Sequence, residues 1–512
     1  MKTGRLVSLT RNISVALFLF ITTFANAQNE AVFLGSIDSL WSNPGNWSEG
    51  LKPNENVDYV TINKDVLIDE DVTIQNLRDA EPCTLTVKAG KKMTVLASID
   101  WNNGNFILEN ASQLVYQQDL HAILKKKIVA FDQDTHALEF IASPVLEVYT
   151  PSLENGFLTD PDTGFDLVYY NESDHKWVDF HDTPFNLENG HGYAYINALD
   201  TVLVFEGKLK GSATPVEVSL DYHANNGGLA GCNLVGNPLP CNALTDRSYY
   251  TLDGKGKSLL AVPASSATVI PPCKGIFVKA ESAGEVVSFS KTEDFQMMEN
   301  AGYVELYVSK TSAQDAAIDN AIVSFNSGDD LGKFLMFEEQ PSLFFAKDGK
   351  DLAIMSVDSV DALPLKFKAA ENTSYTMKFE QKELNLNYLH LIDNLAGNNI
   401  DLLTTPTYTF TANTNDYASR FKLVFDPHYG VEENGLSTNF AYYADGVIYI
   451  QNIDMQNVAS LQIADMNGRI VHSEAISSRD GVHTVSTKLI PGIYVLRLVS
   501  GNAVMTQKMV IN

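Results

Sequence analysis

The sequence predicts an all-β protein built from several domains, and three observations lead to this prediction. Its 512 residues include 26 Phe and 21 Tyr, which together with Val, Ile and Thr suit the half-buried surface of a pleated sheet. Short runs of alternating apolar and polar residues recur along the chain, separated by Gly, Asn, Asp and Pro. No segment keeps a helical apolar period for long. At the usual domain size, a chain of this length forms about three or four units.

The first 27 residues have the composition of a secretory signal peptide. Three basic residues precede the apolar stretch Ile13 to Phe24, and Ala25-Asn26-Ala27 offers small side chains to a signal peptidase. The alternative is a membrane anchor, but the apolar stretch is shorter than the ~20 residues that cross the hydrocarbon core. We therefore expect an exported chain that starts at Gln28 and carries no transmembrane helix.

Turn-rich seams divide the exported chain into units. We place these at 28–125, 126–297 and 298–428, followed by a polar linker at 429–439 and a last module at 440–512. Short apolar segments in the first unit could be the rungs of a small β-solenoid or the strands of a sandwich. Their uneven spacing does not decide between the two folds. The next units are expected to be β-sandwich domains. In the last module, Asn467-Gly468 is a strong hairpin signal.

The chain is acidic, with a formal net charge of −27. Removal of Lys2, Arg5 and Arg11 with the signal peptide takes this charge to −30. Nucleic acid and anionic membrane surfaces are bound through Lys and Arg, so both are poor partners for this chain. The charge favours solubility on an exposed surface.

Four cysteines lie in the exported part, where disulfides persist. They are Cys83, Cys232, Cys241 and Cys273, and four thiols allow three full pairings. If the apolar segments 233–236 and 275–278 pair antiparallel, Cys241 and Cys273 lie at the same end of the pair. A bridge between these two is the favoured pairing.

An acidic turn is the candidate metal site. Asp160, Asp162 and Asp166 place oxygen donors around Gly164, as a Ca²⁺ loop requires, but no bidentate Glu follows. The alternative is a solvated turn. Apart from calcium, no cofactor is expected.

Tryptophans supply the candidate ligand site. Trp41, Trp47 and Trp177 could form an aromatic platform for a sugar, although Trp41 and Trp47 could instead cap the core of the first unit. The sequence contains neither a GxSxG elbow nor an HExxH motif. We therefore expect no enzyme, while a glycosidase pair hidden among the abundant carboxylates stays open.

The carboxyl end resembles a known family. The segments SLQIADMNGRIVHSEAI from Ser460 and LIPGIYVLRLVSGNAVMTQKMVIN from Leu489 are similar to the type A sorting domain of proteins exported by the type IX secretion system of Bacteroidetes. The resemblance implies an immunoglobulin-like sandwich that addresses the chain to the type IX machinery. It also implies display on the outer-membrane cell surface or release outside the cell.

The body is similar to large exported Bacteroidetes proteins of unassigned activity. WSNPGNWSEGLKP from Trp41 and NLVGNPLP from Asn233 carry this resemblance. Ser39, Thr201 and Ser359 stand in triplets similar to the O-glycosylation acceptor of that phylum, although such triplets also occur in buried strands. The resemblance implies surface-displayed or released β-domains and no named enzyme. Our interpretation is a non-enzymatic surface protein with a structural or adhesive role. The alternatives are a carbohydrate-binding protein, with a surface polysaccharide or a host or other extracellular glycan as partner, and a secreted glycoside hydrolase.

Overall fold

The computed structural model describes residues 29–132, 138–160, 164–224, 230–294, 302–313, 317–325, 329–336, 340–425, 441–444, 446–450, 459–466, 468–476, 483–486, 489–500 and 503–511. The expected signal peptide and the expected linker at 429–439 lie outside these residues.

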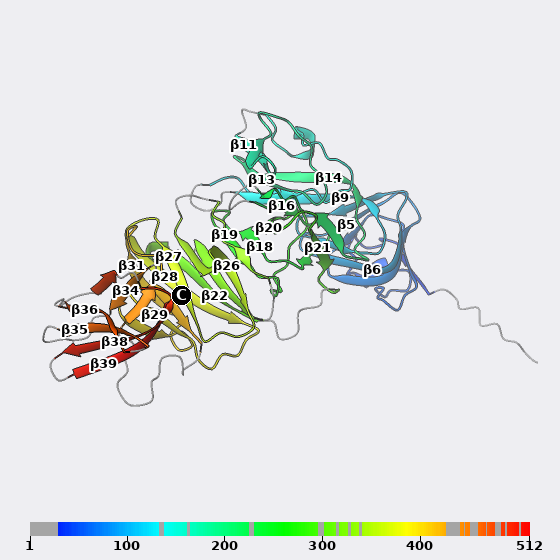
Figure 1. Ribbon diagram of the computed structural model, residues 1–512. Helices are drawn as coiled ribbons and strands as arrows, with labels where there is room; N and C mark the ends of the chain where they lie inside the picture. Colours follow the sequence, from blue (N-terminus) through cyan, green and yellow to red (C-terminus); the bar gives the residue numbers. More distant parts are fainter. Residues whose placement is uncertain are drawn as a thin grey trace, which may run out of the picture.

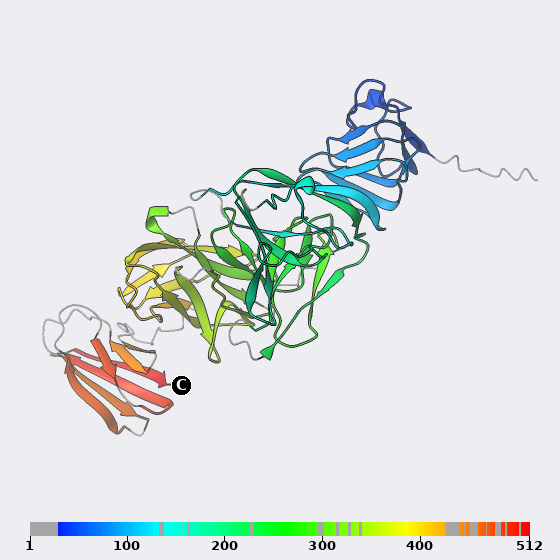
Figure 2. The ribbon, with the colours of Figure 1, turned by 90° about the horizontal axis from the view of Figure 1, so that it is seen from above.

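The fold is all-β, as the sequence predicts. Besides strands, the described residues form only short 3₁₀ turns, such as η1 (Pro44–Asn46), η2 (Leu153–Asn155) and η5 (Thr311–Ala313). None of the helices in the described part of the chain is long and apolar enough to cross a bilayer. Seen from above, the units follow one another in chain order, with the first unit at one end and the last module at the other (Figure 2).

The first unit is a β-solenoid. One parallel sheet holds β1 (Glu30–Phe33), β2 (Tyr59–Ile62), β4 (Val72–Asp79), β6 (Lys92–Asp100) and β8 (Gln113–Val115). A second parallel sheet holds β3 (Val66–Ile68), β5 (Thr84–Val87), β7 (Asn105–Leu108) and β9 (Leu120–Ile128). From β2 onward, successive strands alternate between the two sheets, so the chain winds in rungs. Of the two predicted alternatives, parallel pairing decides for the solenoid, because sandwich strands pair antiparallel.

Alternate side chains of each strand point inward and fill the interior of the solenoid. Leu85 and Val87 point inward and are fully buried, as are Phe106 and Leu108 one rung further on. At the far end, the antiparallel strand β14 (Thr201–Leu209) pairs along the whole of β9 and so closes the second sheet. An antiparallel cap of this kind removes an exposed parallel edge.

The middle of the molecule contains three antiparallel sheets (Figure 1). In spatial order, the first holds β10 (Glu139–Ala142), β13 (Gly192–Asn197), β11 (Phe165–Asn171) and β12 (Lys176–Asp179). The second holds β16 (Cys232–Gly236), β20 (Gly275–Lys279), β18 (Tyr249–Leu252) and β19 (Leu259–Val262). The third holds β15 (Val216–Ser219), β21 (Val286–Lys291) and β17 (Ala243–Thr245).

A large folded-over sheet follows. Its strands are β22 (Gly302–Lys310), β23 (Asp319–Phe325), β24 (Leu331–Gly332), β25 (Ser342–Lys347), β26 (Lys350–Val357), β27 (Ala362–Lys368), β28 (Thr373–Lys382), β29 (His390–Asp393), β30 (Asn398–Asp401), β31 (Thr407–Ala412) and β32 (Phe421–Val424). Phe410 on β31, at one end of the strand order, lies 4.9 Å from Phe421 on β32, near the other end, measured between ring centroids. The sheet therefore folds back as a sandwich around one apolar core.

The last module is a separate sandwich. One sheet, which we call sheet J, holds β33 (Ala441–Ala444), β34 (Val447–Ile450) and β37 (His483–Ser486). The other, sheet K, holds β36 (Ile470–Ile476), β35 (Ala459–Asp465), β38 (Gly492–Ser500) and β39 (Ala503–Ile511) in that spatial order. Its buried side chains form a core of their own. Gly468 has φ +78°, as the predicted hairpin requires, while Asn467 lies outside the described residues.

Candidate functional site

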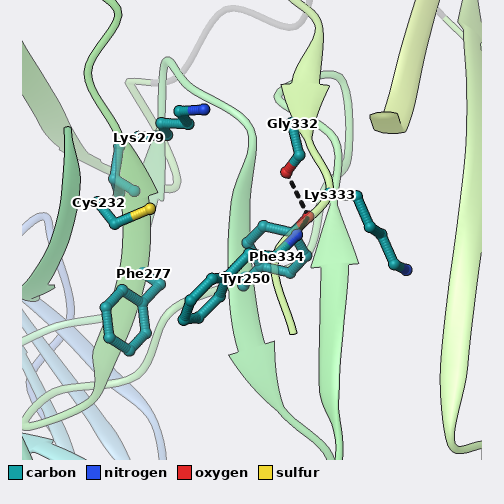
Figure 3. A pocket seen from close by; sticks show the side chains of 8 residues that line it. Cys232, Tyr250, Phe277, Lys279, Gly332, Lys333 and Phe334 are labelled. Atoms are coloured by element: carbon teal, nitrogen blue, oxygen red, sulfur yellow. Dashed lines mark hydrogen bonds between the residues drawn. The ribbon is translucent and has the colours of Figure 1, made fainter. Parts of the chain in front are cut away.

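A small hollow lies where the second middle sheet meets the folded-over sheet (Figure 3). It encloses about 270 Å³ including its open mouth, and its lining residues are Cys232, Tyr250, Phe277, Val278, Lys279, Gly332, Lys333 and Phe334. These residues come from β16, β18, β20 and the segment that begins with β24. Four separate chain segments therefore build one site.

Aromatic rings gather around Phe277. Its ring centroid lies 5.4 Å from Phe334, 5.9 Å from Trp177 and 6.0 Å from Tyr170. The hairpin of β11 and β12 places Trp177 directly opposite Tyr170, with the two rings 5.4 Å apart. We call Tyr170, Trp177, Phe277 and Phe334 the Phe277 cluster. Of the four, Trp177 is the ring most open to solvent, with 38% of its surface exposed.

Polar groups stand at the edges of this cluster. The Tyr250 hydroxyl donates to the Gly332 carbonyl at 2.7 Å and accepts from the Phe334 amide at 3.1 Å (Figure 3). The Tyr170 hydroxyl lies 3.2 Å from His175 Nδ1. A Cβ added at Gly332 would lie only 3.1 Å from Lys279 Nζ, so glycine leaves room for this ammonium.

Burial sets the charge state of two of these groups. Loss of hydration raises the pKa of Tyr170 to about 12 and the pKa of the Cys232 thiol to about 11. Both stay protonated at neutral pH, and a protonated thiol is a weak nucleophile. The site therefore offers apolar rings, neutral donors and the ammonium of Lys279, a set of groups suited to binding, while the other lysine of the lining, Lys333, is ion-paired with Asp319.

The predicted tryptophan platform is only partly present. Trp41 and Trp47 are 1% and 3% exposed, lie 4.6 Å apart as an edge-to-face pair, and pack with Phe33 in the core. Trp47 Nε1 also donates to the Trp41 carbonyl at 3.0 Å. The expectation that these two bind a ligand is wrong, because both rings are buried in the core of the first unit, which is the alternative that the sequence also offered. Trp177 remains as the exposed candidate.

The predicted disulfide is absent, and the four cysteines are free buried thiols. The antiparallel pairing of β16 with β20 is as predicted, with Leu234 opposite Phe277. However, Cys273 adopts a positive φ of 59°, and its side chain packs into the solenoid side of the core, while Cys241 packs into the neighbouring cluster. The two thiols therefore pack in different cores.

Only two of the three candidate calcium ligands lie within the described residues. Asp162 lies outside the described residues, Asp160 is exposed, and Asp166 lies on β11 with His181 Nε2 3.9 Å from its carboxylate. Among the described residues, no three His, Cys, Asp or Glu side chains gather as a metal site. Calcium binding at this turn stays a prediction.

The three candidate glycosylation residues differ in access. Ser39 and Ser359 are exposed, as an acceptor must be. The Thr201 hydroxyl is half-buried and donates to the Gly156 carbonyl at 2.8 Å. Ser39 and Ser359 are thus more accessible than Thr201, and glycosylation at all three stays a prediction.

The comparisons with known proteins bear on the two ends of the chain. Residues 444–512 match the family described as a secretion system C-terminal sorting domain. Residues 32–245, which include the solenoid, match a domain of unknown function (DUF8693). No curated protein matches the chain.

Among solved structures, a "Biofilm associated protein - BSP domain" is similar at 8% identity and a TM-score of 0.15. The likeness covers 78% of this chain and 66% of that chain, and it is too low to carry an argument. The C-terminal match confirms the predicted sorting domain. It supports export through the type IX machinery to the cell surface or the extracellular space.

Proposed function

We propose that the chain is a surface-displayed or released β-protein of Bacteroidetes with a structural or adhesive role and no catalytic activity, delivered by its last module after removal of the signal peptide. The observation that carries the proposal is the sorting-domain match over residues 444–512, together with the separate core of that module. A module with its own core folds without the rest of the chain, which an address label needs.

The way the preceding units join supports a structural role. The solenoid and the first middle sheet share one apolar core, which includes Phe33, Leu124 and Tyr195. Further along, the Asn320 side chain bonds both the amide and the carbonyl of Ala261 on the edge strand β19, each at 2.8 Å. These joins make one continuous array of sheets (Figure 2), which suits a protein that extends from a surface.

Deletion of residues 441–512 in the native host tests the delivery. We expect the truncated chain to accumulate inside the cell envelope, measured by immunoblot of culture medium, surface and envelope fractions. A matched chain with an unrelated sandwich in place of the module controls for size. Normal amounts of the truncated chain outside the cell would refute the proposal.

A second candidate function is glycan binding at the Phe277 cluster. It is favoured by Trp177, whose half-open ring stands beside Tyr170 and Phe277 with an ammonium near by, because sugars stack their C–H faces on aromatic rings. The enclosed part of the hollow holds only about one water molecule, so a sugar would bind over Trp177 and not inside.

A glycan array with the purified exported chain tests this candidate. We expect Trp177→Ala to lose binding, and Phe131→Ala, which removes another exposed ring 47% open to solvent, to keep it. Repeating the array with a calcium chelator tests the turn that contains Asp160 and Asp166. Release of reducing sugar from a bound glycan would instead favour the glycoside hydrolase.

A further inference from the structure

The outer face of sheet K departs from the usual pattern of a sandwich. Its inner face supplies Leu461, Ile463, Leu496 and Leu498 to the core, and all four are fully buried. In a sandwich the opposite face is normally polar. Here several large apolar side chains stand exposed on that face and its turns, namely Met466, Ile470, Ile490, Ile493, Val495 and Val510.

Strand register shows that these side chains are neighbours. Ile470 pairs with Ala464, and Ala464 pairs with Val495, so the three form one row across the sheet. Ile493 pairs with Val510 in the next row. Directly paired residues share a face of the sheet. The exposed side chains thus form one patch, which we call the K patch: Ala464, Ile470, Ile493, Val495 and Val510.

Basic residues border the K patch. Lys508 pairs with Val495, and Arg497 lies one row further along, where its Nη1 donates to Gln462 Oε1 at 3.3 Å. Within the described residues, neither Lys508 nor Arg497 forms an ion pair with a carboxylate. Five acidic and five basic residues balance in 440–512, whereas the whole chain carries −27. The patch is therefore a local apolar and basic surface on an acidic protein.

The module is attached to the rest of the chain through its other sheet. Tyr417, which precedes β32, stacks on Tyr449 of sheet J at 4.6 Å, and Tyr449 stacks on Tyr442 at 4.8 Å. The Tyr442 hydroxyl also donates to that of Tyr417. Because sheet J makes this contact, the K patch stays open: Ile470 and Val510 are each 55% exposed.

We propose that the K patch is the surface by which the sorting module binds a protein of the export machinery, and that this partner presents an apolar surface bordered by carboxylates. The inference rests on the proposed function and adds the binding surface and the chemistry of the partner. An exposed apolar cluster is typical of a surface that contacts a protein or a membrane, and Lys508 and Arg497 favour a protein partner with acidic complements. A second copy fits poorly, because a two-fold contact through this face would bring basic groups together.

Polar substitutions that keep a β-branched side chain test the K patch in the full chain. We expect the triple variant Ile493→Thr/Val495→Thr/Val510→Thr to fall about tenfold in the exported fraction, which is what about 1.4 kcal/mol of lost binding produces, and to accumulate in the envelope. Threonine keeps the β propensity of these positions. The control variant Ser460→Thr/Ser473→Thr/Thr506→Ser changes exposed polar positions of sheet K and should be exported normally.

A variant that changes one charge tests the K patch independently. Lys508→Glu leaves the apolar residues in place, and we expect its export to fall as well. If the triple variant has a lower melting temperature than the wild type, Lys508→Glu alone decides. Normal export of a folded triple variant, or of Lys508→Glu, overturns the K patch while deletion of the module still blocks export. Patch-dependent binding of the purified chain to phosphatidylglycerol vesicles would assign the face to a membrane and also overturn the proposal.

Discussion

Replacement of Arg420 by Met should destabilise the folded-over sheet. The Arg420 side chain is 4% exposed and holds the fully buried Asp393 with two bonds, Nε to Oδ1 at 2.8 Å and Nη2 to Oδ2 at 2.6 Å. Its Nη1 donates to the Thr411 carbonyl at 2.7 Å, and its guanidinium lies over the rings of Phe410 and Phe421. All of these contacts are lost in Arg420→Met.

The expected cost follows from what remains around Asp393. Breaking a buried ion pair by removing one partner costs about 3–5 kcal/mol. Asp393 keeps donors from the Leu395 and Ala396 amides and the Tyr408 hydroxyl, at 2.8 to 3.1 Å. These donors place the cost at the lower end, about 3 kcal/mol. The double variant Asp393→Asn/Arg420→Met should regain at least half of this loss, because it leaves no buried charge without a partner.

Hydrogen exchange on the full chain measures this cost locally, which matters because a multi-domain protein does not unfold in one step. A loss of about 3 kcal/mol speeds exchange through opening by about 150-fold in β29, β31 and β32. Peptides from the solenoid and from sheet K should not change. Asp416→Asn is the control, because Asp416 lies 3.9 Å from Arg420 at a partly exposed position and should cost under about 1 kcal/mol. An Arg420→Met variant within fivefold of wild type would refute the reasoning.

Three further predictions follow from buried groups. Burial raises the pKa of Glu172, but hydrogen bonds from His223 and the Gly231 amide lower it by more, so the pKa lies below the usual 4.5. The stability that this carboxylate adds should therefore be present above pH 4.5 and be lost as the pH falls below it, which should speed hydrogen exchange around β11. The Glu172→Gln variant should not show this pH-dependent increase. Burial raises the pKa of Cys241 and Cys273 to about 12, so a thiol reagent should label almost no cysteine in the folded chain and four after denaturation, whereas a bridge would leave two. Trp41→Ala should cost about 3–5 kcal/mol in the first rungs, measured by exchange, and equal exchange in Trp41→Ala and wild type would contradict its place in the core.

The sequence predicted strands better than it predicted their partners. Inward positions such as Leu85 and Val87 alternate with polar neighbours, and this pattern is visible locally. The solenoid repeat is hidden because paired positions are unevenly spaced: Val66 pairs with Leu85, and Ile107 pairs with Ile123. The turns between rungs differ in length, so no fixed period marks the rungs. Only the parallel pairing separates the two alternatives.

The Phe277 cluster could not be predicted as a site for a related reason. Trp177, Phe277 and Phe334 belong to three segments with no shared motif or spacing, and tertiary packing alone brings them together. The cysteines show a second limit. The antiparallel pairing of the strands next to Cys241 and Cys273 was predicted correctly, but Cys273 lies outside the paired strand with a positive φ, and its thiol packs in a different core from that of Cys241. Alternation along a strand predicts a side chain's direction only where the backbone stays extended.

The hydrophobic cores and the contacts between units determine which unit can be removed from the folded chain. The core of the solenoid extends from Phe33 to Cys273, so the first units cannot be separated without exposing apolar surface. The last module shares no such core, and its described attachment to the preceding sheet is the ring stack of Tyr417, Tyr442 and Tyr449. Stacked aromatic pairs contribute about 0.5–1.5 kcal/mol each beyond area burial, far less than a shared core. Removal of the module after export should therefore leave the preceding sheets folded. A protein built in this way can lose its sorting module without losing the fold of the other units.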